Sequence, residues 1–263
     1  TLDVLDSAGK PVRHYSSKPK NKFEQPPEWP DLERPPELLP TAAGMNRFPW
    51  NLRYESPTEL PGAFYAGNGP QGPYVLPGTY TLKLTVAGKS QSVPLEIKLD
   101  PRVKVSQPDL QKRFDLQMKV RDDIEELHTS VNQLRGVRSQ LAVVKKRLKE
   151  EGDKGKPVIA ACDELEKKTA PVEQELIQVK MQSSEGNLRY PNMLDEQYDS
   201  FRSTLEGADG TPTSAELAVF DQLHGRLEKQ VTTWKQIAET DVPTVNDLVR
   251  KENISLVEVP AGK

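Results

Sequence analysis

The sequence has almost no cysteine. Cys162 is the single cysteine in 263 residues. One thiol forms no intramolecular disulfide, and a cysteine-based zinc site needs several thiolates, so the sequence excludes the first and argues against the second. Long apolar runs are also missing, so we predict no membrane span. Neither sign of charge dominates, because the chain has 36 basic and 39 acidic residues. Without a basic face, we expect no nucleic-acid partner.

Catalytic motifs are scarce as well. The three histidines, His14, His128 and His224, are far apart, and no two lie within one helical turn. A metal or catalytic site would need histidines from separate elements together with carboxylates, so we interpret these three as solvated side chains on helices or strands. The G-x-S-x-G motif of a hydrolase nucleophile is absent. We therefore predict no catalytic, cofactor-binding or metal-binding residue, and no cofactor.

Two patterns imitate functional sites. Residues 67–72, GNGPQG, match G-x-G-x-x-G, but Pro70 lies inside the motif and a strand pattern follows where a dinucleotide site needs a helix. A flexible loop is the better interpretation. Asp122, Asp123, Glu125 and Glu126 form an acidic run. Neighbours on one helix point in different directions, so a solvated face is favoured over an acid–base pair.

Two single residues and one short motif have both a bland and a functional interpretation. Cys162 shares an apolar helical stripe, which favours a buried, inert thiol over a reactive one. Trp50 alternates with other apolar residues, which favours a core tryptophan over a sugar-stacking platform. The run from Asn253 to Ser255 fits a glycosylation sequon, a match that is common by chance.

Residues 1–105 have β patterns. Alternation around the turn 6–10 predicts a first hairpin, and alternation over 79–86 and 93–99 around a turn at 87–89 predicts a second. Residues 48–54 also alternate and predict another strand. The proline-rich stretch 16–44 predicts an extended crossing loop, because proline lacks the N–H that a sheet requires. These strands fit an Ig-like antiparallel β-sandwich.

Residues 106–263 change to helical periodicity. Apolar residues spaced three and four apart predict one long helix from about Pro108 to Leu148, roughly 60 Å long. A second helix is predicted to about Gln182, with a kink or split at Pro171. Thr213 to Glu216 predicts a capping box, and Pro243 opens a last short helix. The tail 254–259 alternates, as an edge strand would. We predict an α+β chain in which the sandwich is followed by an antiparallel α-helical bundle with one long helix.

Several motifs carry a family resemblance. They are GMNRFPWNLRY at 44–54, PGTYTLKLTV at 77–86, KLDPRV at 98–103, FDL at 114–116, and His128 with VNQLR at 131–135. Together they resemble the C-terminal region of large bacterial proteins with sortilin-like, BNR-repeat (Asp-box) β-propellers, often labelled glycosyl-hydrolase-like. The hairpin with DSAGK at 6–10 resembles the Ig-like domain of flagellar hook-capping proteins. The resemblance implies an extracytoplasmic protein that is periplasmic, cell-surface or secreted.

Two functions follow from this resemblance. The first is a non-catalytic structural and interaction module behind a β-propeller, with that propeller, another envelope protein or a second copy of the chain as partner. The alternative is an accessory part of a propeller hydrolase acting on glycans or peptides. Its support is the loop 61–78 with Phe64, Tyr65 and Tyr74. The chain has no signal peptide or initiator methionine, so we expect a fragment or a processed chain.

Overall fold

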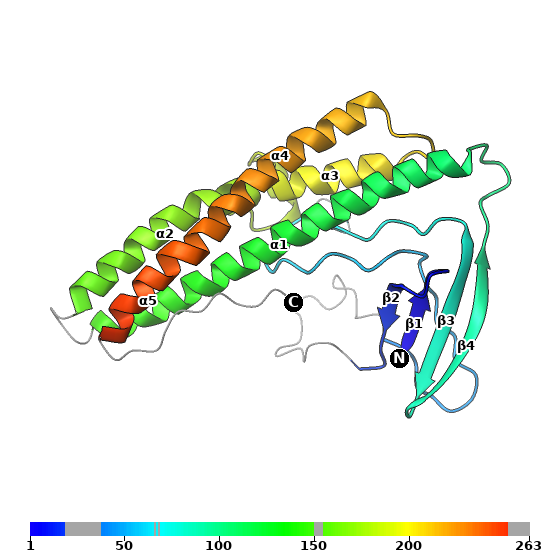
Figure 1. The fold of residues 1–263 in the computed structure, drawn as a ribbon, viewed down its shortest axis with the longest axis horizontal. Helices are drawn as coiled ribbons and strands as arrows, with labels where there is room; N and C mark the ends of the chain where they lie inside the picture. Colours follow the sequence, from blue (N-terminus) through cyan, green and yellow to red (C-terminus); the bar gives the residue numbers. More distant parts are fainter. Residues whose placement is uncertain (19–37, 66, 68, 150–154, 252–263) are drawn as a thin grey trace.

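The computed structural model describes residues 1–18, 38–65, 67, 69–149 and 155–251. A β-sheet lies at one end and an elongated group of helices extends from it (Figure 1). Several predicted features lie outside the described residues. They are most of the proline-rich loop, the turn near Gly152, the sequon at Asn253 and the strand at 254–259.

The sheet contains both predicted hairpins. Its strands are β1 (Leu2–Leu5), β2 (Pro11–Tyr15), β3 (Gly78–Val86) and β4 (Lys89–Ile97). They are antiparallel in the order β2-β1-β3-β4. In the first turn the carboxylate of Asp6 accepts the N–H groups of Ala8 and Lys10. Gly9 has φ +77°, a conformation that glycine adopts without strain.

The prediction of an Ig-like β-sandwich followed by a helical bundle is wrong. The described residues form one small sheet, and no second sheet packs on it. The expected strand at 48–54 is irregular chain in which only Arg53 makes a bridge, to Tyr74. Two features break the strand: Pro49 has no N–H to donate, and Leu52 has φ 59°, outside the extended region. The alternation of apolar and polar residues did not reveal that Leu52 has a positive φ.

The irregular segment covers part of one face of the sheet instead. Val4, Val12, Val75 and Tyr80 form a small buried cluster. Trp50 packs against it edge-on to Tyr80, with the ring centroids 6.1 Å apart, but is only half-buried. Three apolar side chains of β3 and β4 are exposed, namely Leu84, Val86 and Val93. One layer of sheet with a partial cover therefore replaces the expected two layers.

The long helix α1 (Gln107–Lys149) agrees with the prediction. Its 43 residues span about 64 Å. Ser106 precedes it, and the Ser106 hydroxyl accepts the N–H of Asp109. From Leu116 onward the buried apolar side chains of α1 recur every three or four residues, and Leu110 precedes them: Leu110, Leu116, Val120, Ile124, Leu127, Val131, Leu134, Val137, Leu141, Val144 and Leu148. This stripe provides the surface on which the other helices pack.

The remaining helices are α2 (Lys156–Leu176), the 3₁₀ turn η2 (Ser184–Leu188), α3 (Leu194–Glu206), α4 (Ser214–Gln236), the π-helical turn η3 (Ile237–Asp241) and α5 (Val242–Lys251). The capping box at Thr213 and Glu216 is confirmed. Pro171 lies within α2 without splitting it. Two apolar side chains, Leu217 of α4 and Val179 after α2, are 47% and 43% exposed.

One large apolar cluster holds the helices together. The helix α1 contacts α2, α3 and α4, and the cluster draws side chains from all five α-helices. Leu60, from the segment between β2 and β3, belongs to this helical cluster rather than to the sheet's own. The predicted division of the chain at residues 105/106 stays a prediction. Within the described part of the chain, no helix has the length and apolar character needed to cross a membrane.

Candidate functional site

Residues 54–65, which we call the strap, lie along one face of α1. Five α1 residues point polar groups at the strap: Arg121, Glu125, His128, Asn132 and Arg135. Their spacing of four, three, four and three places them on one helical face. Four of them bind backbone carbonyl groups, those of Glu55, Thr58, Glu59 and Pro61. We call these five residues the polar stripe.

The geometry of the two segments explains this match. From residue 121 to residue 135 a helix rises about 21 Å. From residue 55 to residue 61 an extended chain covers about 20 Å. The strap can therefore run beside α1 and meet a new side chain of the stripe at each helical turn. Figure 1 shows the chain between β2 and β3 leaving the sheet and passing along the helices.

His128 is the centre of a buried polar cluster, the His128 cluster, with Thr58, Tyr65 and Asp195. The imidazole is 2% exposed and Asp195 is fully buried. The Nδ1 atom contacts the carbonyl oxygen of Thr58, and Nε2 lies 2.8 Å from Oδ1 of Asp195. The Tyr65 hydroxyl donates to Oδ2 of Asp195 at 2.7 Å. Three separate segments, the strap, α1 and α3, therefore meet at one imidazole.

The protonated imidazole fits this environment best. A carbonyl oxygen and a carboxylate only accept hydrogen bonds, so each ring nitrogen must donate to satisfy its partner. Burial lowers the pKa of His128, but the hydrogen bond and charge of Asp195, the Thr58 carbonyl and the charge of Glu125 outweigh this and leave the pKa raised. Glu125 itself accepts the N–H of Thr58 at 2.6 Å and the Thr58 hydroxyl at 2.7 Å.

A second cluster, the Asp123 cluster, lies more than one turn earlier on α1 and contains Tyr198 and His224. The Tyr198 hydroxyl donates to Oδ2 of Asp123 at 2.7 Å, and Nδ1 of His224 lies 2.9 Å from the same oxygen. His224 stacks on Phe220, with the ring centroids 5.4 Å apart, and its side chain is 46% exposed. Burial and the charge of Asp123 raise the pKa of Tyr198, so its hydroxyl stays protonated and donates.

Arginine side chains connect the other segments. Arg53 forms a two-pronged pair with Glu206 of α3, at 2.6 and 3.0 Å, and also donates to the Gly72 carbonyl. Arg113 of α1 forms the same kind of pair with Glu216 of α4, at 3.0 and 3.1 Å. Hydrogen bonding to Arg113 is the main cause of the lowered pKa of Glu216. Such planar pairs fix orientation as well as distance.

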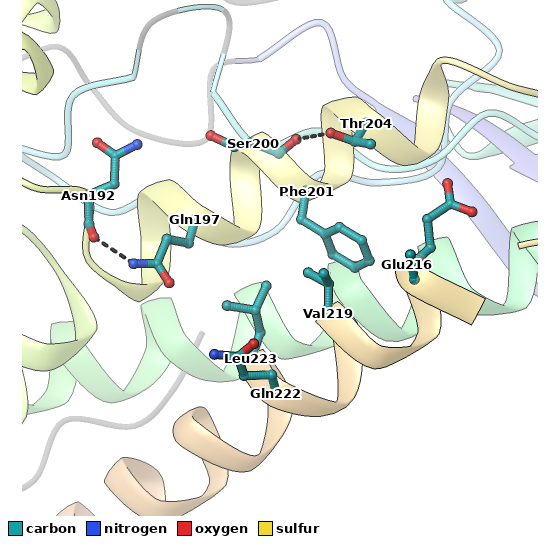
Figure 2. Close-up of a pocket in the computed structure, with 10 residues that line it drawn as sticks. Asn192, Gln197, Ser200, Phe201, Thr204, Glu216, Val219, Gln222 and Leu223 are labelled. Carbon is teal, nitrogen blue, oxygen red and sulfur yellow. Dashed lines mark hydrogen bonds between the residues drawn. The ribbon is translucent and has the colours of Figure 1, made fainter. Parts of the chain in front are cut away.

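A groove of about 510 Å³ lies between α3 and α4 (Figure 2). Phe201 of α3 and the pair Val219 and Leu223 of α4 form its apolar floor. The other described lining residues are Asn192, Gln197, Ser200, Thr204, Ala215, Glu216 and Gln222. Glu216 is the one charged residue among these lining residues, and it is paired with Arg113. The groove therefore presents an apolar floor and a largely uncharged rim.

Much of the rim is already bonded within the chain. Gln197 donates to the Asn192 carbonyl at 2.6 Å, and Thr204 donates to the Ser200 carbonyl at 3.0 Å (Figure 2). Ser200 in turn donates to the Glu196 carbonyl at 2.9 Å. Groups with an internal partner gain little from a polar ligand, so the apolar floor carries most of the binding capacity.

The structure corrects the interpretation of the histidines and of the acidic run. His128 is buried rather than solvated, whereas His14 pairs with Asp3 on the sheet and has an exposed side chain. In the acidic run, Asp122 and Glu126 are exposed as expected. Asp123 is instead 7% exposed and bonded inside the helices.

The missed residues carried a signal in the sequence. Asp123 and His128 lie three and four residues from the apolar positions Val120, Ile124 and Val131. A polar residue on the buried face of a helix needs a partner there, because an unpaired buried polar group is costly. The partners, Asp195 and Tyr198, lie on the matching apolar face of a helix distant in the sequence. The spacing could have identified the buried positions, but not their partners.

The other predicted residues have mixed outcomes. Cys162 is fully buried as predicted, and burial raises the pKa of its thiol to about 11. Residues 67–72 precede a strand rather than a helix, and a Cβ on Gly72 would lie 2.2 Å from the Tyr54 carbonyl. The Tyr65 hydroxyl is hydrogen-bonded to Asp195. Tyr74 is 52% exposed, and its ring centroid lies 3.7 Å from Cζ of the Arg53 guanidinium.

No group of three or more His, Cys, Asp or Glu side chains arranged to hold a metal ion occurs among the described residues. Comparison with known protein families, with curated proteins and with solved structures found no match. The resemblance to Asp-box propeller proteins therefore stays a prediction.

Proposed function

We propose that this chain is a non-catalytic structural and interaction module whose partner docks in the groove between α3 and α4. The observation that carries the proposal is the groove itself, with its apolar floor and its rim already bonded within the chain. A position behind a β-propeller in an exported bacterial protein is the setting we propose for it, on the sequence resemblance alone.

The groove favours one kind of partner. Two neighbouring helices with an apolar floor suit an amphipathic helix, which lays its apolar face into such a groove. The charge of Glu216 is already neutralised by Arg113, at 3.0 Å, so a partner cation gains little there. We therefore propose a helical segment of another protein with an apolar stripe and uncharged polar flanks.

The structural half of the proposal depends on the strap. Buried ionisable groups such as His128 and Asp195 are bonded within the chain, where they connect segments distant in the sequence. Such fully bonded networks give a site a defined shape. A groove of defined shape binds at a lower entropic cost than one that must first be ordered.

The test uses two matched variants of the full chain. Val219→Glu places a charge on the groove floor, and Val143→Glu places one on an equally open part of α1, since the two valines are 41% and 49% exposed. Partners are captured by chemical cross-linking and identified, and a peptide covering the cross-linked segment is titrated against each purified variant. We expect a helical peptide whose Kd rises at least about tenfold with Val219→Glu, a change of about 1.4 kcal/mol, and is unchanged by Val143→Glu.

Three results would contradict the proposal. The first is a peptide affinity that Val219→Glu does not change. The second is turnover of a glycan or peptide substrate by the purified chain, which would favour the hydrolase alternative. The third is a set of cross-links that map to the exposed side chains of the sheet, Leu84, Val86 and Val93, because these would move the interface away from the groove.

A further inference from the structure

The strap is held by side chains that differ in how they respond to pH. Within the polar stripe, Arg121 and Arg135 keep their charge at all physiological pH values, and Asn132 does not ionise. His128 is the one residue of the polar stripe whose side-chain type, imidazole, gains or loses a proton near neutral pH. It also lies at the centre of the stripe, where it contacts both the strap and α3.

Loss of one proton would leave His128 in an unfavourable environment. Both ring nitrogens face oxygen atoms that accept hydrogen bonds, so a neutral ring must direct a lone pair at the Thr58 carbonyl or at Asp195. The Tyr65 oxygen, 3.3 Å from Nε2, gives no relief, because its proton goes to Asp195. A neutral ring also leaves the carboxylate of Asp195 buried without a countercharge.

The surrounding charges define the response. Asp195 from α3 and Glu125 from α1 are the acidic groups that act on His128, and Tyr65 reaches it from the strap. Burial, followed by the charge and hydrogen bond of Asp195, raises the pKa of the Tyr65 hydroxyl and keeps it protonated, and the charges of Asp199 and Glu196 of α3 add to this. Two carboxylates, Asp195 and Glu125, therefore act on the ring, and a cationic ring offsets part of their negative charge whereas a neutral ring offsets none.

From this geometry we propose that His128 is a protonation-controlled latch: the imidazolium holds the strap on α1 and α3, and the neutral imidazole releases it. Release withdraws Leu60 from the helical core and frees the carboxylate of Glu125 from Thr58. It also loosens the connection between the sheet and the helices, since the strap lies between β2 and β3. The latch is closed at low pH and opens as pH rises.

The experiment is hydrogen exchange of the full chain between pH 6 and pH 9, with exchange times rescaled for the intrinsic pH dependence of amide chemistry. The informative amides are those of Thr58, bonded to Glu125, and Ala63, bonded to the Leu60 carbonyl. We expect their rescaled opening constants to rise between about pH 6.5 and the folded pKa of His128, by up to about tenfold per pH unit, which is the slope for one linked proton, and to level off above that pKa. Amides in the middle of α4 should show no such rise.

Matched variants separate the latch from general loosening. His128→Gln should abolish the pH dependence of the strap amides, whereas His224→Gln should preserve it. Rescaled strap exchange that does not vary with pH in the wild type overturns the proposal, as does an unchanged pH dependence in His128→Gln or a loosening of strap and α4 together. If His128→Gln fails to fold, the test is the pH dependence of amide exchange in the wild-type strap compared with that in wild-type α4.

Discussion

The two polar clusters on α1 contain the same three kinds of side chain in different surroundings. In the His128 cluster the histidine is on α1, is 2% exposed and meets a fully buried aspartate. In the Asp123 cluster the aspartate is on α1, and its histidine, His224, has a side chain that is 46% exposed. Water can replace the partner of His224 but not that of His128. We therefore expect the His–Asp pair to contribute much more to the free energy of unfolding in the His128 cluster than in the Asp123 cluster.

Removing the buried aspartate should have the largest effect. Asp195→Ala leaves the His128 charge and the Tyr65 hydroxyl without their shared partner, and we expect a loss of about 3–5 kcal/mol in the free energy of unfolding. Urea denaturation of the full chain measures this loss. A loss under about 1 kcal/mol would show that water enters the cluster and satisfies it.

The corresponding change in the other cluster should cost less. Asp123→Ala leaves the Tyr198 hydroxyl unsatisfied while His224 turns to solvent, so we expect a loss of about 1–3 kcal/mol. The same denaturation experiment places the two variants on one scale. A loss equal to or above that of Asp195→Ala would remove the contrast between the clusters.

The pH dependence of stability should come from the buried histidine. The folded pKa of His128 is raised above its ordinary value of 6.5. Its stabilising contribution is therefore fully present below about pH 6.5 and is lost as pH rises through the folded pKa. The difference in unfolding free energy between wild type and His128→Gln should shrink over that interval. A difference that grows with rising pH would mean that the neutral ring is the form that fits.

His224→Gln should have the smallest effect. A contact in which the His224 side chain is half-exposed contributes between about 0 and 1 kcal/mol, because water competes for the imidazole. Thermal or urea unfolding should give a loss within that range. A loss above about 2 kcal/mol would indicate that His224 is as deeply involved as His128.

The sequence predicts the helices better than the sheet region. A run of apolar residues such as Val120, Ile124, Leu127 and Val131 identifies one buried face, and α1 follows it over 43 residues. Helical hydrogen bonds are local, so the pattern and the structure depend on the same residues. The capping box at Thr213 was predictable for the same reason.

The region between the hairpins was not predictable in this way. Residues 48–54 alternate like a strand, but the positive φ of Leu52 and the missing N–H of Pro49 prevent sheet pairing. The strap is positioned by partners on α1 that lie about 70 residues later in the sequence. Local pattern does not contain such distant pairings, so the polar stripe became visible only in the folded chain.

The account depends most directly on the protonation of His128. Nitrogen-15 NMR of the imidazole rings at pH 6.5, where an unperturbed histidine is about half protonated, reports whether one or both ring nitrogens carry a proton. The account predicts that both Nδ1 and Nε2 of His128 are protonated, with the Nδ1 proton on the Thr58 carbonyl and the Nε2 proton on Asp195. A neutral His128 ring with one protonated nitrogen at pH 6.5 would contradict the account.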